Sequence, residues 1–543
     1  YMSRKTKNGQ KTKQRGKNKM KKTNTIIGTL RITARGIGFV LPEGKDEWIR
    51  IDDEYLNTGL HGDTVEVKIK HREKQKTARV KKVLKRNKHT FVGTLQKDNE
   101  NDLYIHPQDP RVYTDIYIQN PATHKKHVGK KVAVKINTWE DPRVFPEGTL
   151  IEIIGLPDTH ETEMKAILLD REIANSFDAE VENEAQELQK QKDKIMQDAL
   201  AERLDYRDAT TLTIDPEDAK DFDDALSYKE LEDGNIEIGV HIADVTHYVK
   251  PHTALDEEAF ERGTSTYLVD RTIPMLPEIL SNDLCSLNPN EDKLAFSTLF
   301  IIDKKSLRED EKKVHIKSYR VEETVICSNK RFSYEEAQKV LDTKKDTLYK
   351  ELSTLNTLAK KLARGNKENG AISFSSEEVK FTLDKNGTPL SVALKTIGET
   401  NEMIEQWMLL ANKSVTKFVH EKIPEAKRLF LYRIHDKPDK ERVIELVQLL
   451  RTLGYTPKIQ NGTLSSKEIN RILTEAKDTP EENMLQISTI RSMAKAVYSI
   501  QNIGHFGLAF THYTHFTSPI RRYPDMIVHR LIKMYKKHKT IPQ

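Results

Sequence analysis

Apolar and polar residues alternate over the first folded stretch of the chain, which begins near residue 24. Residues 25–33 alternate in this way, and residues 34–42 combine glycines with an aromatic side chain. A period of two predicts β-strands, and glycines suit a sharply bent sheet. Residues 47–51 and 63–70 have the same character. We therefore predict a small β-barrel over residues 24–88.

The pattern of this first barrel recurs further along the chain. Gly28-Thr-Leu is echoed by Gly93-Thr-Leu, and residues 62–69 are echoed by residues 129–136, offsets of 65 (93 − 28) and 67 (129 − 62). A repeat of this size predicts two successive domains of one type, residues 24–88 and 89–158. Short strands with basic flanks favour the OB or cold-shock barrel, which binds single strands by stacking their bases. The candidate stacking residues are Phe39, Trp48, Tyr104 and His106, and a place in the core is the alternative for each.

The period changes after the second barrel. Residues 179–203 are rich in Glu, Gln, Lys, Asp and Ala and lack Gly and Pro. This composition predicts an exposed helix within a helical connector, residues 159–204. Strand-like and helix-like runs then follow one another, which predicts one large mixed α/β (α+β) domain over residues 205–538. The expected strands are residues 236–243, 294–303, 314–326, 371–374 and 379–383. The expected helices are residues 254–262 (ending at Gly263), 334–363 and 401–422.

Size and composition agree with a multidomain protein. A chain of 543 residues is too long for one core and suggests roughly three or four domains. No run approaches the ~20 apolar residues of a membrane span, and the N-terminus has no apolar segment of a secretory signal. The two cysteines, Cys285 and Cys327, have no metal-binding spacing and indicate ordinary thiols in a reducing compartment. We therefore expect a cytoplasmic protein.

Charge is unevenly distributed along the chain. The net charge is 89 − 83 = +6, but residues 1–22 carry ten Lys or Arg and no acid. Such a segment predicts a disordered basic arm, residues 1–23, that contacts phosphate backbones nonspecifically. A plain solubility tail is the alternative.

The stretch that says most about chemistry is acidic. Its ten residues, 215–224, hold six carboxylates, from Asp215, Glu217, Asp218, Asp221, Asp223 and Asp224. Apolar neighbours such as Ile214 and Phe222 indicate that the stretch is packed, and packed oxygen ligands suit Mg²⁺ or Mn²⁺. Two such ions about 4 Å apart can hold the attacking and leaving oxygens of a phosphoryl displacement. A solvated acidic turn is the alternative, and an EF-hand loop is disfavoured because its ligand spacing and turn glycine are missing.

A second informative stretch, residues 517–525, places Arg521 and Arg522 beside a Ser-Pro turn. Such planar cations can hold a phosphate or stabilise a phosphoryl transition state, and a structural ion pair with Asp525 is the alternative. Tyr267 and Phe374 lie in segments where they could stack on a base, although a tyrosine or phenylalanine is more often a core or surface residue. The sequence has no Cys/His cluster and no Gly-Lys-Ser/Thr loop, which disfavours a zinc hydrolase and an NTPase.

Residues 213–225 closely resemble the signature of the ribonuclease II/ribonuclease R family, the bacterial 3′-to-5′ exoribonucleases with an RNB domain. Further matching stretches are residues 273–277, 284–287, 430–438, 505–508 and 517–525, and two of them, 430–438 and 517–525, look more like the ribonuclease R branch. The resemblance implies two N-terminal cold-shock domains and an RNB-type catalytic domain. It also implies an Mg²⁺-dependent, processive hydrolysis of single-stranded RNA from a free 3′ end to nucleoside 5′-monophosphates.

The resemblance assigns catalytic roles position by position. Asp215, Asp221 and Asp224 resemble the family's Mg²⁺ ligands, and Mn²⁺ is the alternative ion. Asp223 matches the aspartate that is essential for cleavage. Arg521 matches the arginine that supports cleavage.

The resemblance also assigns contacts with RNA. Tyr267 matches the tyrosine that packs on the 3′-terminal nucleotide, and Phe374 matches a second stacking aromatic. Glu405 resembles a glutamate that contacts the terminal nucleotides, and Arg522 lies beside the catalytic arginine.

The family pattern continues beyond the last residue of this sequence. It includes a C-terminal S1 domain, which we expect after residue 543, and without which we expect weaker capture of RNA. Two rival functions share most of the sequence features: a noncatalytic RNA-binding or remodelling protein, and a DNA exonuclease that lacks 2′-hydroxyl recognition. We expect a monomer that binds no membrane.

Overall fold

The computed structural model describes residues 25–42, 48–72, 75–374, 379–384, 387–394, 398–460 and 462–538. The predicted basic arm, residues 1–23, lies outside these ranges. The chain divides into two compact units, Tyr1–Ala174 and Asn175–Gln543. No helix in the described ranges is both long enough and apolar enough to cross a bilayer.

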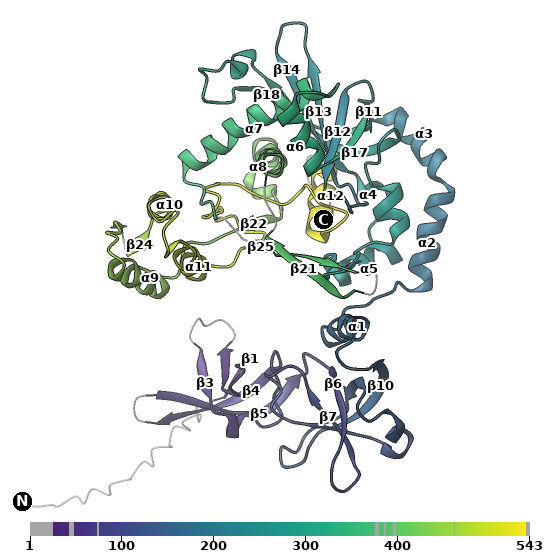
Figure 1. Cartoon of the computed structure of the whole chain (residues 1–543), viewed down its shortest axis with the longest axis vertical. Coiled ribbons are helices and arrows are strands. Elements are labelled where there is room, and N and C mark those ends of the chain that lie inside the picture. The colour runs from purple at the N-terminus through teal and green to yellow at the C-terminus, as the bar shows by residue number, and fades with distance from the viewer. Residues whose placement is uncertain are drawn as a thin grey trace, which may run out of the picture. The chain divides into compact units, whose positions relative to one another are not determined.

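The first unit contains two closed five-stranded barrels, drawn in purple and blue in Figure 1. The first barrel has the order β1-β2-β3-β5-β4, and the second has the order β10-β8-β7-β6-β9. The strands of the first barrel are β1 Thr25–Ile32, β2 Gly38–Pro42, β3 Ile49–Ile51, β4 Thr64–Arg72 and β5 Gln75–Lys85. Those of the second are β6 Thr90–Lys97, β7 Leu103–Pro107, β8 Ile116–Ile118, β9 Lys131–Ile136 and β10 Glu147–Gly155. The prediction of two small barrels is confirmed.

The sequence repeat has a structural cause. Gly28 pairs with Pro42 and Val65, and Gly93 pairs with Pro107 and Val132, so each glycine has the same place in its barrel. A Cβ atom on Gly28 would lie 2.2 Å from the carbonyl oxygen of Leu41, and one on Gly93 would lie 2.5 Å from that of His106. Backbone crowding at the bend therefore requires glycine in both barrels.

The predicted connector is divided between the two units. Helix α1 His160–Asp170 packs on the second barrel, where Ala166 joins Val92 and Ala133 in a small core. The single helix that we expected over residues 179–203 is two helices, α2 Ala179–Lys190 and α3 Lys192–Glu202, which meet at Gln191. It is not fully exposed, because Val181 and Ala185 are buried in the second unit.

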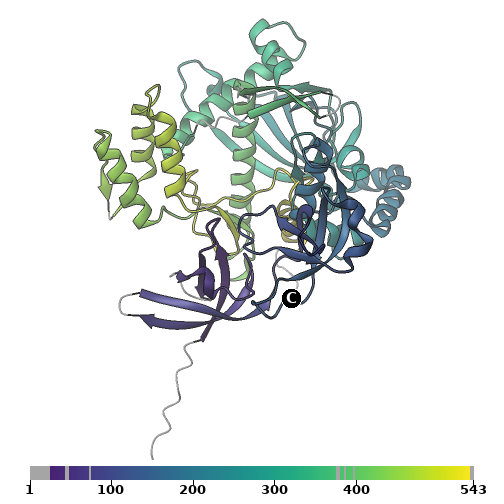
Figure 2. The same ribbon diagram turned by 60° about the horizontal axis from the view of Figure 1, so that its bottom comes forward.

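The second unit is built on a seven-stranded sheet of order β11-β18-β17-β14-β13-β12-β19 (Figure 2). Neighbours are antiparallel except for β11 with β18 and β12 with β19, which are parallel. The strands are β11 Leu204–Asp205, β12 Thr210–Asp215, β13 Asp224–Glu230, β14 Ile236–Ala243, β17 Asp292–Ile302, β18 Ile316–Cys327 and β19 Lys330–Ser333. The expected strands at residues 236–243, 294–303 and 314–326 are thus present.

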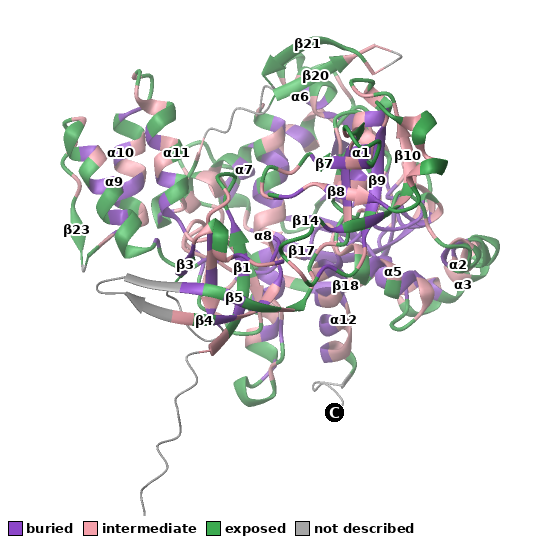
Figure 3. Ribbon diagram, turned by 90° about the horizontal axis from the view of Figure 1, so that it is seen from below, coloured by how far each residue is buried: buried purple, intermediate pink, exposed green. Residues whose placement is uncertain are grey.

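Helices cover both faces of this sheet. On one face, alternate residues such as Ile238 and Phe300 pack against α6, α7 and α8, and on the other Ala225 and Leu299 pack against α2 to α5. The final helix, α12, contributes to both cores. The helices of the layers are α4 Val245–Tyr248, α5 Ala254–Arg262, α6 Tyr334–Thr343, α7 Tyr349–Asn369, α8 Glu399–Lys422 and α12 Tyr523–His538. Figure 3 shows the buried residues gathered in the strands and on the inner sides of these helices.

Two of our local predictions need correction. The expected strand at residues 371–374 is irregular, because it follows the left-handed cap Gly370 (φ 106°) and Ile372 N–H bonds to the Gly507 carbonyl instead of to a sheet. The helix expected over residues 334–363 is interrupted at Lys344 (φ 57°) and becomes α6 and α7.

Smaller elements complete the second unit. Helices α9 Lys440–Thr452, α10 Ser466–Glu475 and α11 Glu482–Ser492 form a group with a core of its own at one end of the unit. Four two-stranded antiparallel sheets in the described ranges are β15 Thr266–Tyr267 with β16 Thr272–Ile273, β20 Val379–Leu383 with β21 Pro389–Leu394, β22 Tyr432–Ile434 with β25 Val497–Ser499, and β23 Ile459–Gln460 with β24 Thr463–Leu464. A π-helical turn covers Ile279–Leu284.

Candidate active site

The acidic stretch connects two neighbouring strands of the large sheet. β12 ends at Asp215 and β13 begins at Asp224. Because β12 and β13 are antiparallel neighbours, the end of one and the start of the other lie at the same edge of the sheet. The connecting residues 216–223, which we call the acidic loop, bring Asp221 and Asp223 to that edge.

The carboxylates of this stretch separate into two groups. Asp215 is 4% exposed and Asp223 is 1% exposed, whereas Glu217 and Asp218 face solvent. The alternative of a wholly solvated acidic turn is therefore wrong for the buried group. Asp221 and Asp224 are half-buried and lie beside it. Four of the six acids are thus gathered in what we call the acidic group: Asp215, Asp221, Asp223 and Asp224.

The second motif meets the first through both backbone and side chain. Ile520 N–H donates a hydrogen bond to Asp223 Oδ1 (2.9 Å), although 297 residues separate them in the chain. Arg521 Nε lies 3.2 Å from Asp221 Oδ2 and 3.2 Å from Asp223 Oδ2, and Arg521 Nη2 donates to the Asp221 carbonyl (3.1 Å). The guanidinium is therefore the counter-ion of the acidic group.

Burial and mutual repulsion disturb the acidity of these groups. Burial, and then the charges of Asp224 and Asp221, raise the pKa of Asp215 to about 8. Burial raises the pKa of Asp224 to about 6 and that of Asp223 well above its usual range, although Arg521 opposes both shifts. Burial disfavours the charge of Arg521, but the Asp223 and Asp221 carboxylates outweigh it and raise the pKa of Arg521. The single positive charge of Arg521 therefore does not balance the negative charges of the acidic group.

The acidic group has the donor chemistry of a site for hard divalent cations. Asp215 Oδ2 and Asp223 Oδ2 are buried and, among the described residues, have no hydrogen-bond partner. Arg521 Nε lies close to Asp223 Oδ2, but neither atom makes a hydrogen bond among the described residues. The two groups are therefore near one another but not aligned for a hydrogen bond. Across the described ranges, no group of three or more acidic, histidine or cysteine side chains is arranged so that it could hold a metal ion as it stands. Unpartnered carboxylate oxygens with raised pKa values fit Mg²⁺ or Mn²⁺, which would replace the missing positive charge.

The two adjacent arginines have different partners. Arg522 Nε and Nη2 donate to the two oxygens of Asp525, at 3.0 and 2.7 Å, and Asp525 is fully buried. Asp525 Oδ1 also accepts a hydrogen bond from Ser518 N–H (2.8 Å). The structural ion pair that we considered as an alternative is therefore present at Arg522, while Arg521 faces the acidic group.

Main-chain pairing brings Tyr267 towards the same place. Ser265 N–H donates to the Arg521 carbonyl (3.0 Å), and Thr264 forms a bridge with Arg522. Tyr267 follows on β15 with its side chain 55% exposed, and Arg521 is one of the charged groups around its hydroxyl. An exposed ring beside the acidic group is free to stack on a base.

Phe374 and Glu405 share a cavity of about 380 Å³ between α7 and α8. Phe374 is half-buried and packs against the core of the α9–α11 group, so it is partly a core residue. Burial, and then the charge of Glu402, raise the pKa of Glu405. The same cavity has Arg364 and Lys367 on its α7 side.

The four stacking candidates of the first unit are not core residues. Phe39, Tyr104 and His106 alternate with buried neighbours on their strands and thus lie on the outer faces of the barrels. Trp48 is 36% exposed, with the Arg31 guanidinium 4.6 Å from its ring centroid, and His106 Nδ1 lies 2.8 Å from Asp115 Oδ1. Whether these residues contact nucleic acid stays a prediction.

The second barrel also carries aromatic residues that sequence reasoning missed. Tyr104 stacks on Tyr117 with 5.6 Å between centroids, and Tyr117 lies 5.3 Å from Phe145, which is 56% exposed. We call Tyr104, Tyr117 and Phe145 the aromatic row. Tyr117 lies on β8, which is only three residues long, so no alternation of apolar and polar residues marked this strand in the sequence.

Sequence reasoning missed further residues around the acidic group. Burial, and then the charges of Asp224 and Asp215, raise the pKa of Tyr334, so its hydroxyl belongs to this site. Arg331 and Ser286 bond to the acidic loop. Arg331 lies on β19 and Tyr334 begins α6, and their proximity to the acidic group follows from the parallel pairing of Asp215 with Ser333. Only knowledge of the strand order could have identified them.

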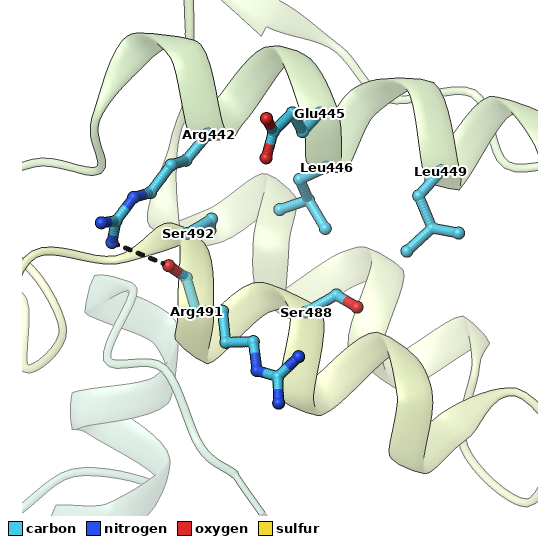
Figure 4. Close-up of a pocket in the computed structure, with 7 residues that line it drawn as sticks. All are labelled: Arg442, Glu445, Leu446, Leu449, Ser488, Arg491 and Ser492. Carbon is cyan, nitrogen blue, oxygen red and sulfur yellow. Dashed lines mark hydrogen bonds between the residues drawn. The ribbon is translucent and has the colours of Figure 1, made fainter. Parts of the chain in front are cut away.

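A further cavity, of about 460 Å³, lies between α9 and α11 (Figure 4). It is lined by Arg442, Glu445, Leu446, Leu449, Ser488, Arg491 and Ser492. Its lining contains a single carboxylate, that of Glu445, and so lacks the several acidic side chains that hold cations for phosphoryl transfer. The acidic group at the sheet edge has the set of carboxylates that this cavity lacks.

Comparisons with known proteins identify the domains of both units. Residues 203–538 match the RNB domain, residues 28–83 the ribonuclease B OB domain, and residues 104–178 a cold shock domain. Ribonuclease R of Aquifex aeolicus is 35% identical over 525 residues, which are 96% of this chain and 72% of the relative. The RNB match supports the predicted catalytic fold, and the OB and cold shock matches support the two barrels.

Solved structures have the same fold. Mycoplasma genitalium RNase R in complex with ribose-methylated single-stranded RNA matches with a TM-score of 0.84 and 29% identity, over 94% of this chain and 79% of that one. Yeast Ssd1, a pseudonuclease, matches in fold alone, with a TM-score of 0.71 and 20% identity over 96% of this chain and 70% of that one. From the domain match and the identity to its relatives, we conclude that the chain belongs to the RNB-domain family of 3′-to-5′ exoribonucleases, as a ribonuclease R homologue.

Proposed function

We propose that this exoribonuclease hydrolyses single-stranded RNA processively from a free 3′ end, with Mg²⁺ at the acidic group, and releases nucleoside 5′-monophosphates. The observation that carries the proposal is the pair of buried, unpartnered oxygens Asp215 Oδ2 and Asp223 Oδ2, described above. A protein that only binds RNA gains nothing from anionic groups where phosphates must lie. A phosphoryl-transfer site needs such oxygens to hold cations.

The chain's own residues divide the work of the reaction. Asp215, Asp221 and Asp224 would hold the cations, and bound Mg²⁺ supplies Lewis-acid polarisation and charge neutralisation at the phosphate. Asp223 Oδ2 accepts a hydrogen bond from the attacking water and orients it. Arg521 donates to a nonbridging phosphate oxygen and stabilises the negative charge that grows there.

The bond changes balance as a hydrolysis. The water oxygen forms a bond to phosphorus, and the bond from phosphorus to the 3′ oxygen of the preceding nucleotide breaks. The proton of the water passes to that leaving oxygen, so the shortened RNA keeps a 3′-hydroxyl. Tyr267 would pack on the terminal base and hold it in line, and Phe374 and Glu405 would contact the neighbouring nucleotide.

The deciding test is a time course on a 5′-labelled single-stranded RNA with and without Mg²⁺, beside a DNA of the same sequence. We expect shortening of the RNA alone, only with metal, and nucleoside 5′-monophosphates from the first time point. With RNA in excess, a processive enzyme leaves full-length substrate and short end product with few intermediates. Shortening of the DNA at the same rate would overturn the assignment to RNA.

A noncatalytic RNA-binding protein is the second candidate, and the shared fold of the pseudonuclease Ssd1 is the observation in its favour. Tight RNA binding without shortening at any Mg²⁺ or Mn²⁺ concentration would select it. We further propose a monomer in the cytoplasm, where the free thiols of Cys285 and Cys327 would stay reduced.

A further inference from the structure

The acidic loop is held from one side by an arginine of the neighbouring strand. Arg331 Nη2 donates hydrogen bonds to the carbonyl oxygens of Pro216 (2.6 Å) and Glu217 (2.7 Å). Arg331 lies on β19, opposite Thr213 of β12, so the strand pairing sets its place. Its guanidinium carbon is also 5.6 Å from the ring centroid of Phe222, near the other end of the loop.

The loop is held from the other side by a buried serine. Ser286 Oγ accepts a hydrogen bond from Phe222 N–H (2.9 Å) and donates one to the Lys220 carbonyl (2.8 Å). Leu287 N–H donates to the Phe222 carbonyl (3.0 Å). Ser286 is fully buried and follows the π-helical turn Ile279–Leu284.

These hydrogen bonds constrain the backbone at residues next to the proposed metal ligands. Pro216 follows Asp215, and Lys220 and Phe222 flank Asp221. Four carboxylates that repel one another would otherwise move apart, because mutual repulsion favours an open loop. Arg331 bonds to backbone carbonyls and not to the carboxylates, so it fixes the loop without occupying a ligand oxygen.

We infer that Arg331 is a positioning residue that preorganises the acidic loop for cation binding, with Ser286 as its counterpart on the other side. The inference rests on the proposed function, in which Asp215 and Asp221 are ligands. Outer residues that orient metal ligands typically change metal affinity by about 10- to 100-fold when they are mutated. Arg331 is therefore a determinant of metal affinity.

The test compares Arg331→Met and Arg331→Lys with the control Lys330→Met. Lys330 is the next residue on β19, and its Nζ pairs with Asp346 Oδ2 (2.8 Å) away from the loop. Mn²⁺ affinity is measured on the RNA-free protein by electron paramagnetic resonance, RNA affinity by fluorescence anisotropy in EDTA, and folding by the unfolding midpoint in EDTA. Cleavage is then measured across a range of Mg²⁺ concentrations.

We expect Arg331→Met to weaken Mn²⁺ binding by about 10- to 100-fold, with RNA affinity within about twofold of wild type and cleavage partly restored at high Mg²⁺. Arg331→Lys keeps the charge but not the planar fork, and we expect about a 10-fold loss. Lys330→Met should bind Mn²⁺ like wild type. If Arg331→Met does not fold, Arg331→Lys and Ser286→Ala carry the same test.

The outcomes separate this inference from the proposed function. A wild-type protein that cleaves RNA and binds Mn²⁺, together with folded Arg331 variants of unchanged Mn²⁺ affinity, overturns the inference alone. A wild-type protein that neither binds Mn²⁺ nor cleaves overturns the proposed function, and the inference with it.

Discussion

Arg522 is bound to the fully buried Asp525 by two hydrogen bonds of 3.0 and 2.7 Å, whereas its neighbour Arg521 points at the acidic group. Two adjacent arginines therefore have separable roles. Loss of Arg522 leaves a buried carboxylate without its counter-charge, and loss of Arg521 removes a cation from the acidic group.

We expect Arg522→Ala to lower the free energy of unfolding by about 3 kcal/mol, because breaking a buried pair leaves an unpaired charge. Arg521→Ala should also lower stability, because Asp223 loses its counter-charge, but its distinguishing effect should be a fall in kcat on the order of 10²-fold. Urea denaturation and single-turnover cleavage measure the two effects. The division of roles is wrong if both variants lose stability equally and activity equally.

Asp223→Asn should abolish most cleavage while RNA affinity is retained. We expect a rate loss on the order of 10²-fold or more, because the amide cannot orient the water as a carboxylate does. The variant should also unfold at the same or a higher temperature, since a buried charge with a raised pKa is removed. Asp218→Asn, a solvent-facing member of the same loop, is the control and should cleave like wild type. Wild-type cleavage by Asp223→Asn would refute our assignment of the site.

Neutral histidines in the second unit predict a loss of stability in acid. His241 is fully buried between Ser297 Oγ (2.6 Å) and Ser227 Oγ (2.8 Å), and burial lowers its pKa to about 3. The unfolded imidazole has a pKa of about 6.5, so below this pH the unfolded state binds the extra proton and stability falls until about pH 3. The slope is up to about 1.4 kcal/mol per pH unit for this group.

The free energy of unfolding, measured by denaturation at several pH values, should therefore fall less steeply from pH 7 to pH 4 in His241→Gln than in wild type. His252→Asn is the matched control, because His252 is exposed and its left-handed backbone (φ 65°) tolerates asparagine. An unchanged pH slope in His241→Gln would mean that this histidine does not contribute to the acid sensitivity.

The aromatic row on the second barrel should contribute to RNA binding. Base stacking on an aromatic side chain contributes about 1–3 kcal/mol, so Phe145→Ala should weaken the binding of a long single strand by roughly 5- to 150-fold. The adjacent Val144 is 58% exposed but lies outside the row, which makes Val144→Ala the control. Anisotropy titrations at fixed salt compare the two. Equal RNA affinities of the two variants would mean that the aromatic row does not contribute to RNA binding.

Glycine substitutions should have opposite effects in a barrel and in a helix. Gly93→Ala places a Cβ atom 2.5 Å from a carbonyl oxygen and should lower the thermal unfolding temperature of the first unit. Gly365 lies inside α7 with nothing within 4 Å of its Cβ position, so Gly365→Ala should stabilise the second unit by about 0.5–1 kcal/mol. Calorimetry of the two variants measures the thermal unfolding of both units in one scan.

Local pattern was enough to predict much of the fold. The alternation of residues 236–243 predicted β14, and Gly263 marked the end of α5, where the chain takes a positive φ (68°) that glycine adopts readily. The crowding of carboxylates predicted the acidic group, since a packed acidic stretch has few uses besides cation binding. The family resemblance added the expected roles of Tyr267 and Arg521.

Contacts that depend on strand order could not be predicted. Arg331 and Tyr334 reach the acidic group because β19 pairs with β12 in parallel, and no local pattern shows which distant strands pair. Residues 371–374 have strand-like composition, but Gly370 and the bond from Ile372 to Gly507 override it. The separate roles of Arg521 and Arg522 follow only from the position of Asp525 at the start of α12.

The long separation between the two halves of the acidic site also has a consequence for the order of synthesis. Arg521 Nη2 bonds to the Asp221 carbonyl 300 residues earlier, so the loop leaves the ribosome long before its counter-ion. At about 5–20 residues per second, that interval is on the order of 15–60 s. A nascent chain therefore holds its carboxylates without the guanidinium that balances them. Under the proposed mechanism, cleavage would begin only after Arg521 has been synthesised and has reached the acidic loop.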